Sequence, residues 1–175
     1  MVKKISRRDF IKTTVTASGA AALMPQITFS SQNKKNLSIG FIGTGLRGQW
    51  MLWLATKYPD VEIPAICDID DGMINAALKI IKDSGRKEPE VYKKNDEDFR
   101  NLVKNEDLDG VYIATPWEWH HPMAVAAMKA GIHVGTEVPA ALTVNECWDL
   151  VNVSEKTEKF CMIMENVCYR RDIMA

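Results

Sequence analysis

Patterns that build metal centres and disulfide frameworks are missing from this sequence. Its four cysteines include no C-x-x-C pair, and its three histidines do not stand at spacings that would complete a zinc site with them. We therefore interpret the cysteines as buried thiols and predict no metal site. A strong charge excess is missing too, since the net charge is −1 and the basic residues form no folded patch. Nucleic-acid binding is therefore not expected.

Long apolar runs, low-complexity tracts and internal repeats of solenoid length are also absent. Residues 13–24 are mildly apolar, but this segment is too short and too polar for a transmembrane helix. The 175 residues are enough for one α/β domain with a sizeable core.

The first residues match a twin-arginine export signal. Ser6 to Lys12 follows the pattern S-R-R-x-F-L-K at nearly every position, and a chance arginine pair does not explain the Ser, Phe and Lys around it. No cysteine follows directly after the apolar segment, since the first one is Cys67, so no stable membrane anchor is expected. We predict a signal and linker over residues 1–33, a folded domain over 34–175, and export through the twin-arginine translocase to the periplasm or beyond.

The stretch from Ile39 to Gly48 predicts a buried strand that runs into a glycine-rich turn and then a helix. Gly43, Gly45 and Gly48 have the G-x-G-x-x-G spacing. In a dinucleotide-binding unit these glycines permit a tight turn, a close approach of the backbone to pyrophosphate, and close packing of helix on strand. The diphosphate would then bind the free N–H groups at the helix start.

An acidic residue is expected about 20 residues later, at the end of the next strand. Ile63 to Cys67 is that strand, and Asp68 follows it. A carboxylate there accepts hydrogen bonds from the adenosine ribose and repels a 2′-phosphate, so NAD is favoured over NADP as the cofactor. The alternative is an ordinary βαβ unit with a solvated aspartate.

Further strands and helices alternate along the rest of the chain. Strands are predicted at 90–92, 110–114, 133–136 and 160–164, and helices at 71–81, 96–104, from Pro122 to Gly131, and from the capping box Thr143 to Glu146 onward. The inner face of that last helix is predicted to be Val144, Cys147, Trp148 and Val151. This rhythm predicts an α/β fold with a doubly wound parallel sheet in the order 3-2-1-4-5-6.

Two loops at predicted strand ends carry chemically useful side chains. In Trp117-Glu118-Trp119-His120 the indoles can stack on a nicotinamide or a sugar, and His120 can hydrogen-bond a hydroxyl. Alternatively, the tryptophans pack under a neighbouring domain. His121 is interpreted as a cap of the next helix. Glu137, after the fifth strand, either accepts hydrogen bonds from the cofactor or is a solvated loop residue.

Together these residues resemble the N-terminal half of the Gfo/Idh/MocA family, and more narrowly the NAD-dependent α-N-acetylgalactosaminidases of glycoside hydrolase family 109. The resemblance rests on the twin-arginine leader, the glycine turn, Cys67-Asp68, Trp117 to His120, Glu137 to Ala141, and Met164 to Tyr169. Where the wider family has a lysine that moves a proton during sugar oxidation, this chain has Val138.

The resemblance implies a Rossmann NAD-binding domain followed by a C-terminal α/β substrate domain that this chain lacks. It implies NAD contacts from Leu46, Arg47, Asp68, Trp117, Glu118, Trp119, His120, Glu137, Val138 and Asn166. It also implies glycoside hydrolysis by a redox-neutral cycle of oxidation, elimination, addition and reduction. No catalytic residue is assigned within these 175 residues, and we expect them to be inactive alone.

Three functions compete on the sequence. An exported NAD-dependent glycosidase acting on a small glycoside is favoured by Val138 and the tryptophan-rich loop. An exported sugar oxidoreductase of the same fold is the second, and a non-catalytic NAD-binding module is the third. The sequence leaves the sugar and the oligomeric state open, including a homo-oligomer.

Overall fold

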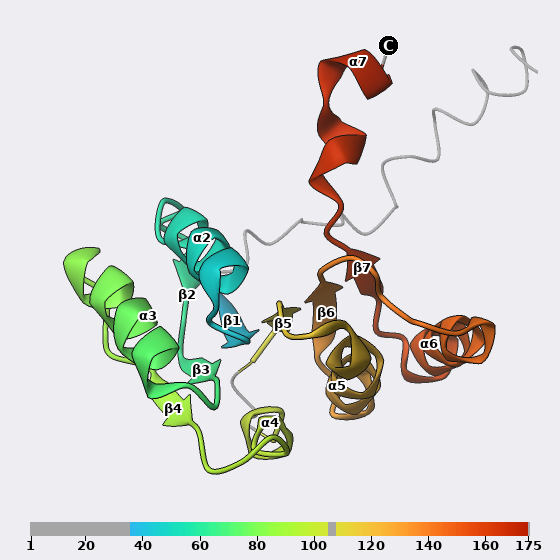
Figure 1. The fold of residues 1–175 in the computed structure, drawn as a ribbon, viewed down its shortest axis with the longest axis horizontal. Coiled ribbons are helices and arrows are strands. Elements are labelled where there is room, and N and C mark those ends of the chain that lie inside the picture. Colours follow the sequence, from blue (N-terminus) through green and yellow to red (C-terminus); the bar gives the residue numbers. More distant parts are fainter. Residues whose placement is uncertain (1–35, 105–107, 175) are drawn as a thin grey trace, which may run out of the picture. The chain divides into compact units, whose positions relative to one another are not determined.

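The computed structural model describes residues 36–104 and 108–174, which form one parallel sheet with helices on both faces (Figure 1). The predicted leader, residues 1–33, lies outside the described residues. Within them the strands are β1 (Leu37–Ile42), β2 (Val61–Glu62), β3 (Ala65–Cys67), β4 (Glu90–Tyr92), β5 (Gly110–Ile113), β6 (His133–Thr136) and β7 (Cys161–Ile163).

The strand order in the described part of the chain is β4-β3-β1-β5-β6-β7, with β2 also paired to β1. Every pairing is parallel. The predicted order 3-2-1-4-5-6 is therefore confirmed. Because the chain crosses over between β4 and β5 to the other side of β1, the carboxyl ends of β1 and β5 lie at the switch point where such sheets bind ligands.

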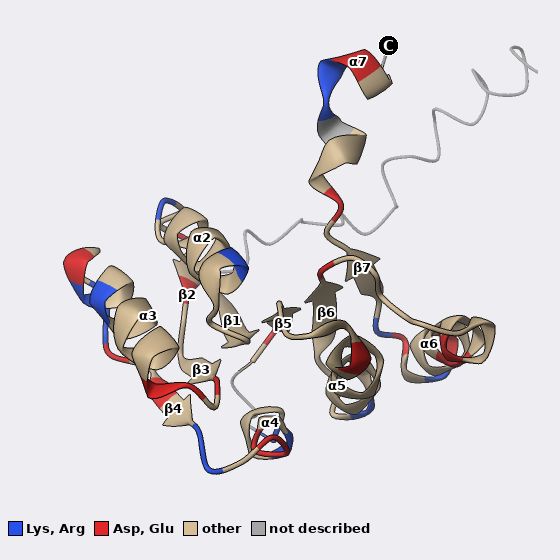
Figure 2. Ribbon diagram, viewed as in Figure 1, with Lys and Arg blue, Asp and Glu red and all other residues tan. Residues whose placement is uncertain are grey.

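The helices divide between the two faces of the sheet (Figure 1). They are α2 (Leu46–Ala55), α3 (Asp71–Asp83), α4 (Phe99–Leu102), α5 (Trp117–Lys129), α6 (Val144–Thr157), the 3₁₀ helix η3 (Asn166–Tyr169) and α7 (Arg171–Met174). Helices α2 and α3 pack on one face, and α4, α5 and α6 on the other. Lys, Arg, Asp and Glu are interspersed over helices and loops (Figure 2).

Two hydrophobic cores follow from the alternation of side chains along the buried strands. Ile42 and Ile113 point to the α4–α6 face, while Phe41, Ile66 and Tyr112 point to the α2–α3 face. Near-continuous apolar strands of this kind are expected when both faces are covered. None of the helices in the described ranges is long and apolar enough to cross a membrane.

Helix α6 shows how periodicity alone was misleading. Its start was predicted correctly, since the Thr143 hydroxyl accepts from the Glu146 N–H and the Glu146 carboxylate accepts from the Thr143 N–H. Its inner face was predicted wrongly: Leu150 and Val153 are buried, whereas Trp148 is 63% exposed. The predicted stripe, Val144, Cys147, Trp148 and Val151, faces away from the sheet. The helix carries two apolar stripes, and only the fold decides which one is covered.

Prolines explain two further differences. The predicted strand 63–67 is shortened to β3, Ala65–Cys67, because Pro64 has no N–H to donate to the ladder, and a separate short strand, β2, precedes it at Val61–Glu62. The helix predicted to begin at Pro122 begins five residues earlier, at Trp117, with Pro116 as its N-cap. Pro122 therefore lies inside α5 rather than at its start.

Two other segments differ in length or role. Helix α4 covers only Phe99–Leu102 of the predicted 96–104. The residues on either side form tighter turns, in which the N–H groups of Asp98 and Lys104 donate to the carbonyls three residues earlier. His121 is not a helix cap. It lies within α5, and its Nε2 is 2.9 Å from a carboxylate oxygen of Asp149 in α6, so it ties the two helices together.

Candidate functional site

The glycine turn joins the end of β1 to the start of α2. Gly43 has φ +86°, and a Cβ there would lie 2.5 Å from the carbonyl oxygen of Ala114 at the end of β5. A Cβ on Gly48 would lie 2.0 Å from the Gly43 carbonyl oxygen. Both positions require glycine for internal reasons: the first for a left-handed turn, the second for the close approach of helix to turn.

Gly45 differs from both of its neighbours. A Cβ built on it would meet no atom of residues 36–104 or 108–174 within 4 Å. Helix α2 begins at the next residue, Leu46, and the first N–H groups of a helix have no carbonyl partner within it. This open backbone with free donors fits the pyrophosphate of a dinucleotide, which the spacing of the glycines predicted.

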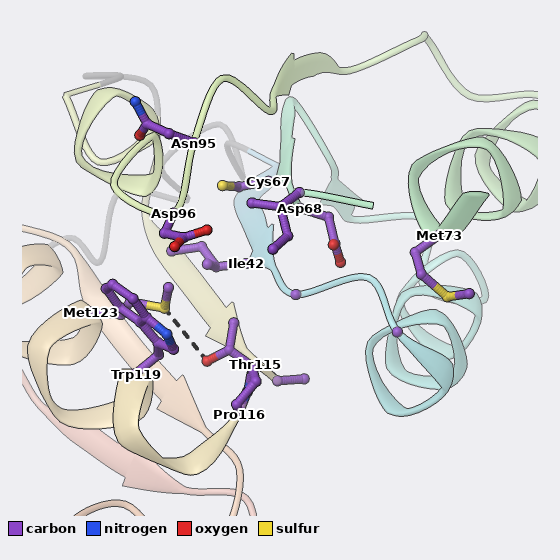
Figure 3. A pocket seen from close by; sticks show the side chains of 14 residues that line it. Ile42, Cys67, Asp68, Met73, Asn95, Asp96, Thr115, Pro116, Trp119 and Met123 are labelled. Carbon is purple, nitrogen blue, oxygen red and sulfur yellow. Dashed lines mark hydrogen bonds between the residues drawn. The ribbon is translucent and has the colours of Figure 1, made fainter. Parts of the chain in front are cut away.

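One pocket opens beside the turn, and we call it the Asp68 pocket (Figure 3). Its volume is about 240 Å³, and residues from the ends of β1, β3 and β5, the loop after β4 and the start of α5 line it. Figure 3 shows Trp119 and Met123 of α5 on one side and Asp68 and Met73 on the other. A largely apolar slot with a carboxylate at one edge suits an adenosine, whose base is flat and whose ribose offers hydroxyl donors.

The Asp68 carboxylate is held by two backbone N–H groups and one hydroxyl. Its Oδ2 accepts from the backbone N–H of Thr44 at 2.6 Å and from the Thr44 hydroxyl at 3.0 Å. Its Oδ1 accepts from the N–H of Asp70 at 3.0 Å. Thr44 is completely buried, so the carboxylate is fixed to the glycine turn itself.

Cys67, immediately before Asp68, also lines this pocket. Its burial, together with the negative charges of Asp98 and Asp68, raises the pKa of the thiol to about 12. The thiol is therefore protonated at neutral pH and does not supply a thiolate nucleophile.

A second pocket lies on the other side of Ala114 and Thr115, which line both, and we call it the Glu137 pocket. Its volume is about 180 Å³. The remaining lining residues are Arg47, Trp117, His120, Glu137 and Val138. The two pockets thus flank the end of β5, next to the glycine turn, as the two halves of a dinucleotide would require.

Glu137 is the centre of a small polar cluster in this second pocket. Its Oε1 accepts from Arg47 Nε at 2.7 Å and also from the hydroxyl of Tyr112. The Arg47 guanidinium lies 5.2 Å from the ring centroid of Trp50. Burial and the adjacent Glu137 carboxylate raise the pKa of Tyr112, so its hydroxyl remains a donor.

The tryptophan-rich segment is shared between the pockets. Trp117 is exposed and lines the Glu137 pocket, whereas Trp119 lines the Asp68 pocket and packs edge-on against Phe99 at 6.1 Å between centroids. Glu118 is exposed on the first turn of α5. The two indoles are therefore placed to contact different parts of a ligand.

His120 is 1% exposed, and both ring nitrogens face backbone carbonyls. Nδ1 is 2.7 Å from the Pro139 oxygen and Nε2 is 2.8 Å from the Thr115 oxygen. The ring therefore connects the loops after β5 and β6. A neutral imidazole carries one N–H, so it donates to one of these two carbonyls. The ring faces the backbone on both sides, which differs from the free hydrogen-bonding role that the sequence suggested.

The remaining predicted contacts are spread more widely. Val138 is exposed and lines the Glu137 pocket. Leu46 is exposed on the first turn of α2. Asn166 lies in η3 and lines neither of the two pockets, so the structure does not bring it together with the other predicted residues.

Sequence reasoning missed two residues of the site, Thr44 and Tyr112. Thr44 is the variable residue inside G-x-G, and a hydroxyl next to the acidic strand end was an available signal. Tyr112 lies in a strand that reads as uniformly apolar, and its partner is 25 residues away. Nothing local marks that hydroxyl as part of a binding site.

A parallel sheet with a glycine turn at its switch point, an acidic residue after the adjacent strand and two flanking pockets defines a Rossmann-type dinucleotide-binding domain. The sequence model of the Gfo/Idh/MocA group, described as "Oxidoreductase family, NAD-binding Rossmann fold", matches residues 37–165. This chain belongs to that family, and NAD is its cofactor.

Curated relatives carry a narrower name. A "Glycosyl hydrolase family 109 protein" of Parabacteroides distasonis is 47% identical over 186 residues, covering 97% of this chain and 40% of that protein. An "Alpha-N-acetylgalactosaminidase" of Tannerella forsythia is also 47% identical, over 190 residues, with the same coverage. The chain thus spans about 40% of the length of these relatives.

Solved structures support the fold. An NAD-binding protein from Listeria innocua is 25% identical with a TM-score of 0.66, covering 79% of this chain and 38% of that one. A scyllo-inositol dehydrogenase from Lactobacillus casei, solved with NAD(H) and scyllo-inositol, is 23% identical with a TM-score of 0.67, covering 78% and 38%. At this identity the second likeness concerns the fold alone.

Proposed function

We propose that this chain is the NAD-binding part of an exported glycosidase that acts on α-linked N-acetylgalactosamine. The observation that carries the proposal is the 47% identity, over nearly the whole chain, to a protein named for that activity. The two pockets support it, because together they offer room for a dinucleotide beside the glycine turn.

The residues near the pockets have defined tasks in this proposal. The N–H groups after Gly45 hold the pyrophosphate, Asp68 binds the adenosine ribose, and Glu137 binds the ribose on the nicotinamide side. Bound NAD would supply a hydride acceptor that later returns the hydride, so the reaction has no net redox change.

The sugar passes through a cycle that needs no pair of acid–base carboxylates. Oxidation at C3 makes the C2 proton acidic, loss of that proton expels the glycosidic oxygen from C1, water adds to C1, and C3 is reduced again. Residues outside this chain would handle the protons, and we expect the chain alone to be inactive.

A sugar oxidoreductase of the same family is the second candidate. It is favoured by the description of the matching family model, "Oxidoreductase family, NAD-binding Rossmann fold". Val138 weighs against it, since the resemblance places a proton-transferring lysine at that position in the oxidoreductases. A non-catalytic NAD-binding module is the third candidate, and the glycosidase proposal predicts a turnover that such a module would lack.

The deciding experiment uses the full-length protein and a chromogenic aryl α-N-acetylgalactosaminide. Under the proposal, sugar is released without net NADH formation, and in heavy water the product gains deuterium at C2. Stoichiometric NADH with the glycosidic bond intact would instead establish an oxidoreductase. If the protein binds NAD but forms neither free sugar nor NADH, the remaining candidate is the non-catalytic NAD-binding module.

Export is a separate proposal that rests on Ser6 to Lys12. Changing Arg7 and Arg8 to Lys keeps the charge but removes the arginine pair that the translocase recognises, so the full-length protein should remain in the cytoplasm. Fractionation followed by immunoblotting measures this, and an unchanged periplasmic yield would refute the route.

A further inference from the structure

We propose that Tyr112 is a positioning residue for NAD: with Arg47, it holds one oxygen of Glu137 so that the other oxygen accepts a hydrogen bond from the nicotinamide-side ribose. The inference rests on NAD binding and is independent of whether the protein hydrolyses a glycoside. Its basis is that both donors converge on the same atom, Glu137 Oε1.

The binding residues follow one another along the dinucleotide from its adenosine end, and this order identifies which half of NAD reaches Glu137. Asp68 occupies the position that binds the adenosine ribose, and the backbone beside Gly45 is open for the pyrophosphate. The Glu137 pocket lies beyond Ala114 and Thr115, on the other side from Asp68. The part of NAD that remains for it is the nicotinamide and its ribose.

The sheet aims the Tyr112 side chain at Glu137. In the register of β5 and β6, Tyr112 is paired with Gly135, two residues before Glu137. A Cβ on Gly135 would lie 3.8 Å from the Tyr112 ring, at ordinary van der Waals distance, so the ring lies alongside β6 at this position. The ring also packs on Phe41 of β1, with 5.6 Å between centroids.

The direction of the hydrogen bond follows from chemistry. A carboxylate oxygen only accepts, so the Tyr112 hydroxyl and the Arg47 Nε–H both donate to Oε1. Tyr112 is 5% exposed, so the ring is buried and its hydroxyl reaches Glu137 from the α2–α3 face of the sheet. With Oε1 held by two donors, Oε2 is the oxygen left to accept from a ribose hydroxyl.

A merely structural role for this contact would have a different signature. If the hydrogen bond from Tyr112 to Glu137 only stabilised the fold, its loss would weaken the binding of every ligand, or would lower thermal stability without changing binding. If the hydrogen bond positions Glu137, its loss weakens the binding of ligands that contain the nicotinamide ribose. Ligands that end at the pyrophosphate should bind as before.

The test measures dissociation constants of NAD and ADP by calorimetry for the full-length protein and Tyr112→Phe, which keeps the ring. We expect the NAD constant to rise about tenfold, the effect of a lost hydrogen bond to a charged group, and the ADP constant to change less than about twofold. Tyr58→Phe, at an exposed tyrosine outside both pockets, is the matched control and should change neither.

A double-mutant cycle with Glu137→Gln tests whether Tyr112 acts through that carboxylate. Glu137→Gln alone should also weaken NAD selectively, and adding Tyr112→Phe should then have little further effect. Equal weakening of NAD and ADP, unchanged NAD binding, or simple additivity of the two changes would each overturn the inference.

If Tyr112→Phe did not fold, a fluorinated tyrosine at position 112 would keep the shape but ionise at lower pH, so NAD affinity should fall at a correspondingly lower pH. Failure of the glycosidase proposal would appear as absent sugar release and would leave these ratios unaffected. A wild-type protein that bound ADP but not NAD would refute the inference directly.

Discussion

The two carboxylates that flank the glycine turn are held in different ways. Asp68 is fixed by the backbone and hydroxyl of Thr44, which belongs to the turn itself. Glu137 is fixed by Arg47 and Tyr112, which come from α2 and β5 and lie 90 and 25 residues away in sequence. The folded sheet assembles both clusters, since Thr44 is itself 24 residues from Asp68. What differs is the donors: the backbone and short side chain of the turn hold one carboxylate, and two long side chains hold the other.

This difference predicts how each pocket responds to substitution. Asp68 accepts mainly from uncharged donors that cannot move without moving the turn. Glu137 accepts from a flexible guanidinium that is partly exposed and from one buried phenol. Damage to the turn should therefore disable both pockets, whereas damage to the side-chain cluster should disable only one.

The largest effect is expected from Gly48→Ala, which places a methyl group 2.0 Å from the backbone oxygen of Gly43. Backbone cannot give way as a flexible side chain can, so the free energy of unfolding should fall by about 3 kcal/mol. Denaturant titration measures this.

Gly45→Ala is the comparison, because its methyl group would contact no atom of the described residues within 4 Å. It should cost under about 1 kcal/mol of stability and instead weaken the binding of NAD and ADP. Equal stability losses at the two glycines would contradict this division.

Asp68→Ala comes next and should act on one pocket. It removes an acceptor for the adenosine ribose, so NAD binding should weaken by about 1–3 kcal/mol. Removing the negative charge should also reduce the preference for NAD over NADP. Calorimetry with both cofactors measures the two effects, with Asp96→Asn, another acid lining the same pocket, as the comparison. Equal affinity of the wild-type protein for NAD and NADP would refute the role of Asp68.

Thr44→Val separates the hydroxyl from the backbone N–H at the same carboxylate. The 3.0 Å hydrogen bond from the hydroxyl is lost while the 2.6 Å bond from the backbone N–H remains. NAD affinity should fall by only about 1 kcal/mol. A loss as large as that of Asp68→Ala would mean that the backbone alone does not hold the carboxylate.

The smallest expected effect concerns alkaline pH and the Glu137 pocket. Burial and Glu137 raise the pKa of Tyr112 in the folded state, so the hydroxyl is ionised more readily in the unfolded chain. The resulting stability is complete below the unfolded pKa of about 10 and is lost as pH rises above it, by about 0.8 kcal/mol at pH ~10.5. Tyr112→Phe should lack this part of the decline. Denaturant titrations of both proteins at pH ~8 and ~10.5 give the difference, and parallel declines would contradict it.

The same contrast explains what the sequence alone could predict. The strand order, the capping box at Thr143 and the place of the glycine turn follow from local patterns, and the structure confirms them. The exposed stripe of α6, with Trp148, was misjudged because both stripes of that helix are apolar and periodicity does not choose between them.

Long-range contacts were beyond local reasoning. The hydroxyl of Tyr112 reaches Glu137 only because β5 and β6 are paired in one register. The start of α5 was misplaced because Pro122 is typical of a first turn, whereas Pro116 already ends the preceding loop. Both errors concern contacts between segments that are distant in sequence, and not the secondary structure that each segment favours by itself.

The two carbonyls on His120 have a dynamic consequence. One imidazole ring lies between the oxygens of Thr115 and Pro139, so the loops that follow β5 and β6 are joined by a single stiff connector. Thr115 borders both pockets, and Pro139 follows Val138 of the second. A neutral imidazole carries one N–H and carbonyl oxygens only accept, so the ring donates to one loop and packs against the other. Opening the loop that accepts would leave a buried N–H without a partner, which is costly. The loops after β5 and β6 should therefore open together, and their amide protons should exchange with solvent in the same cooperative event.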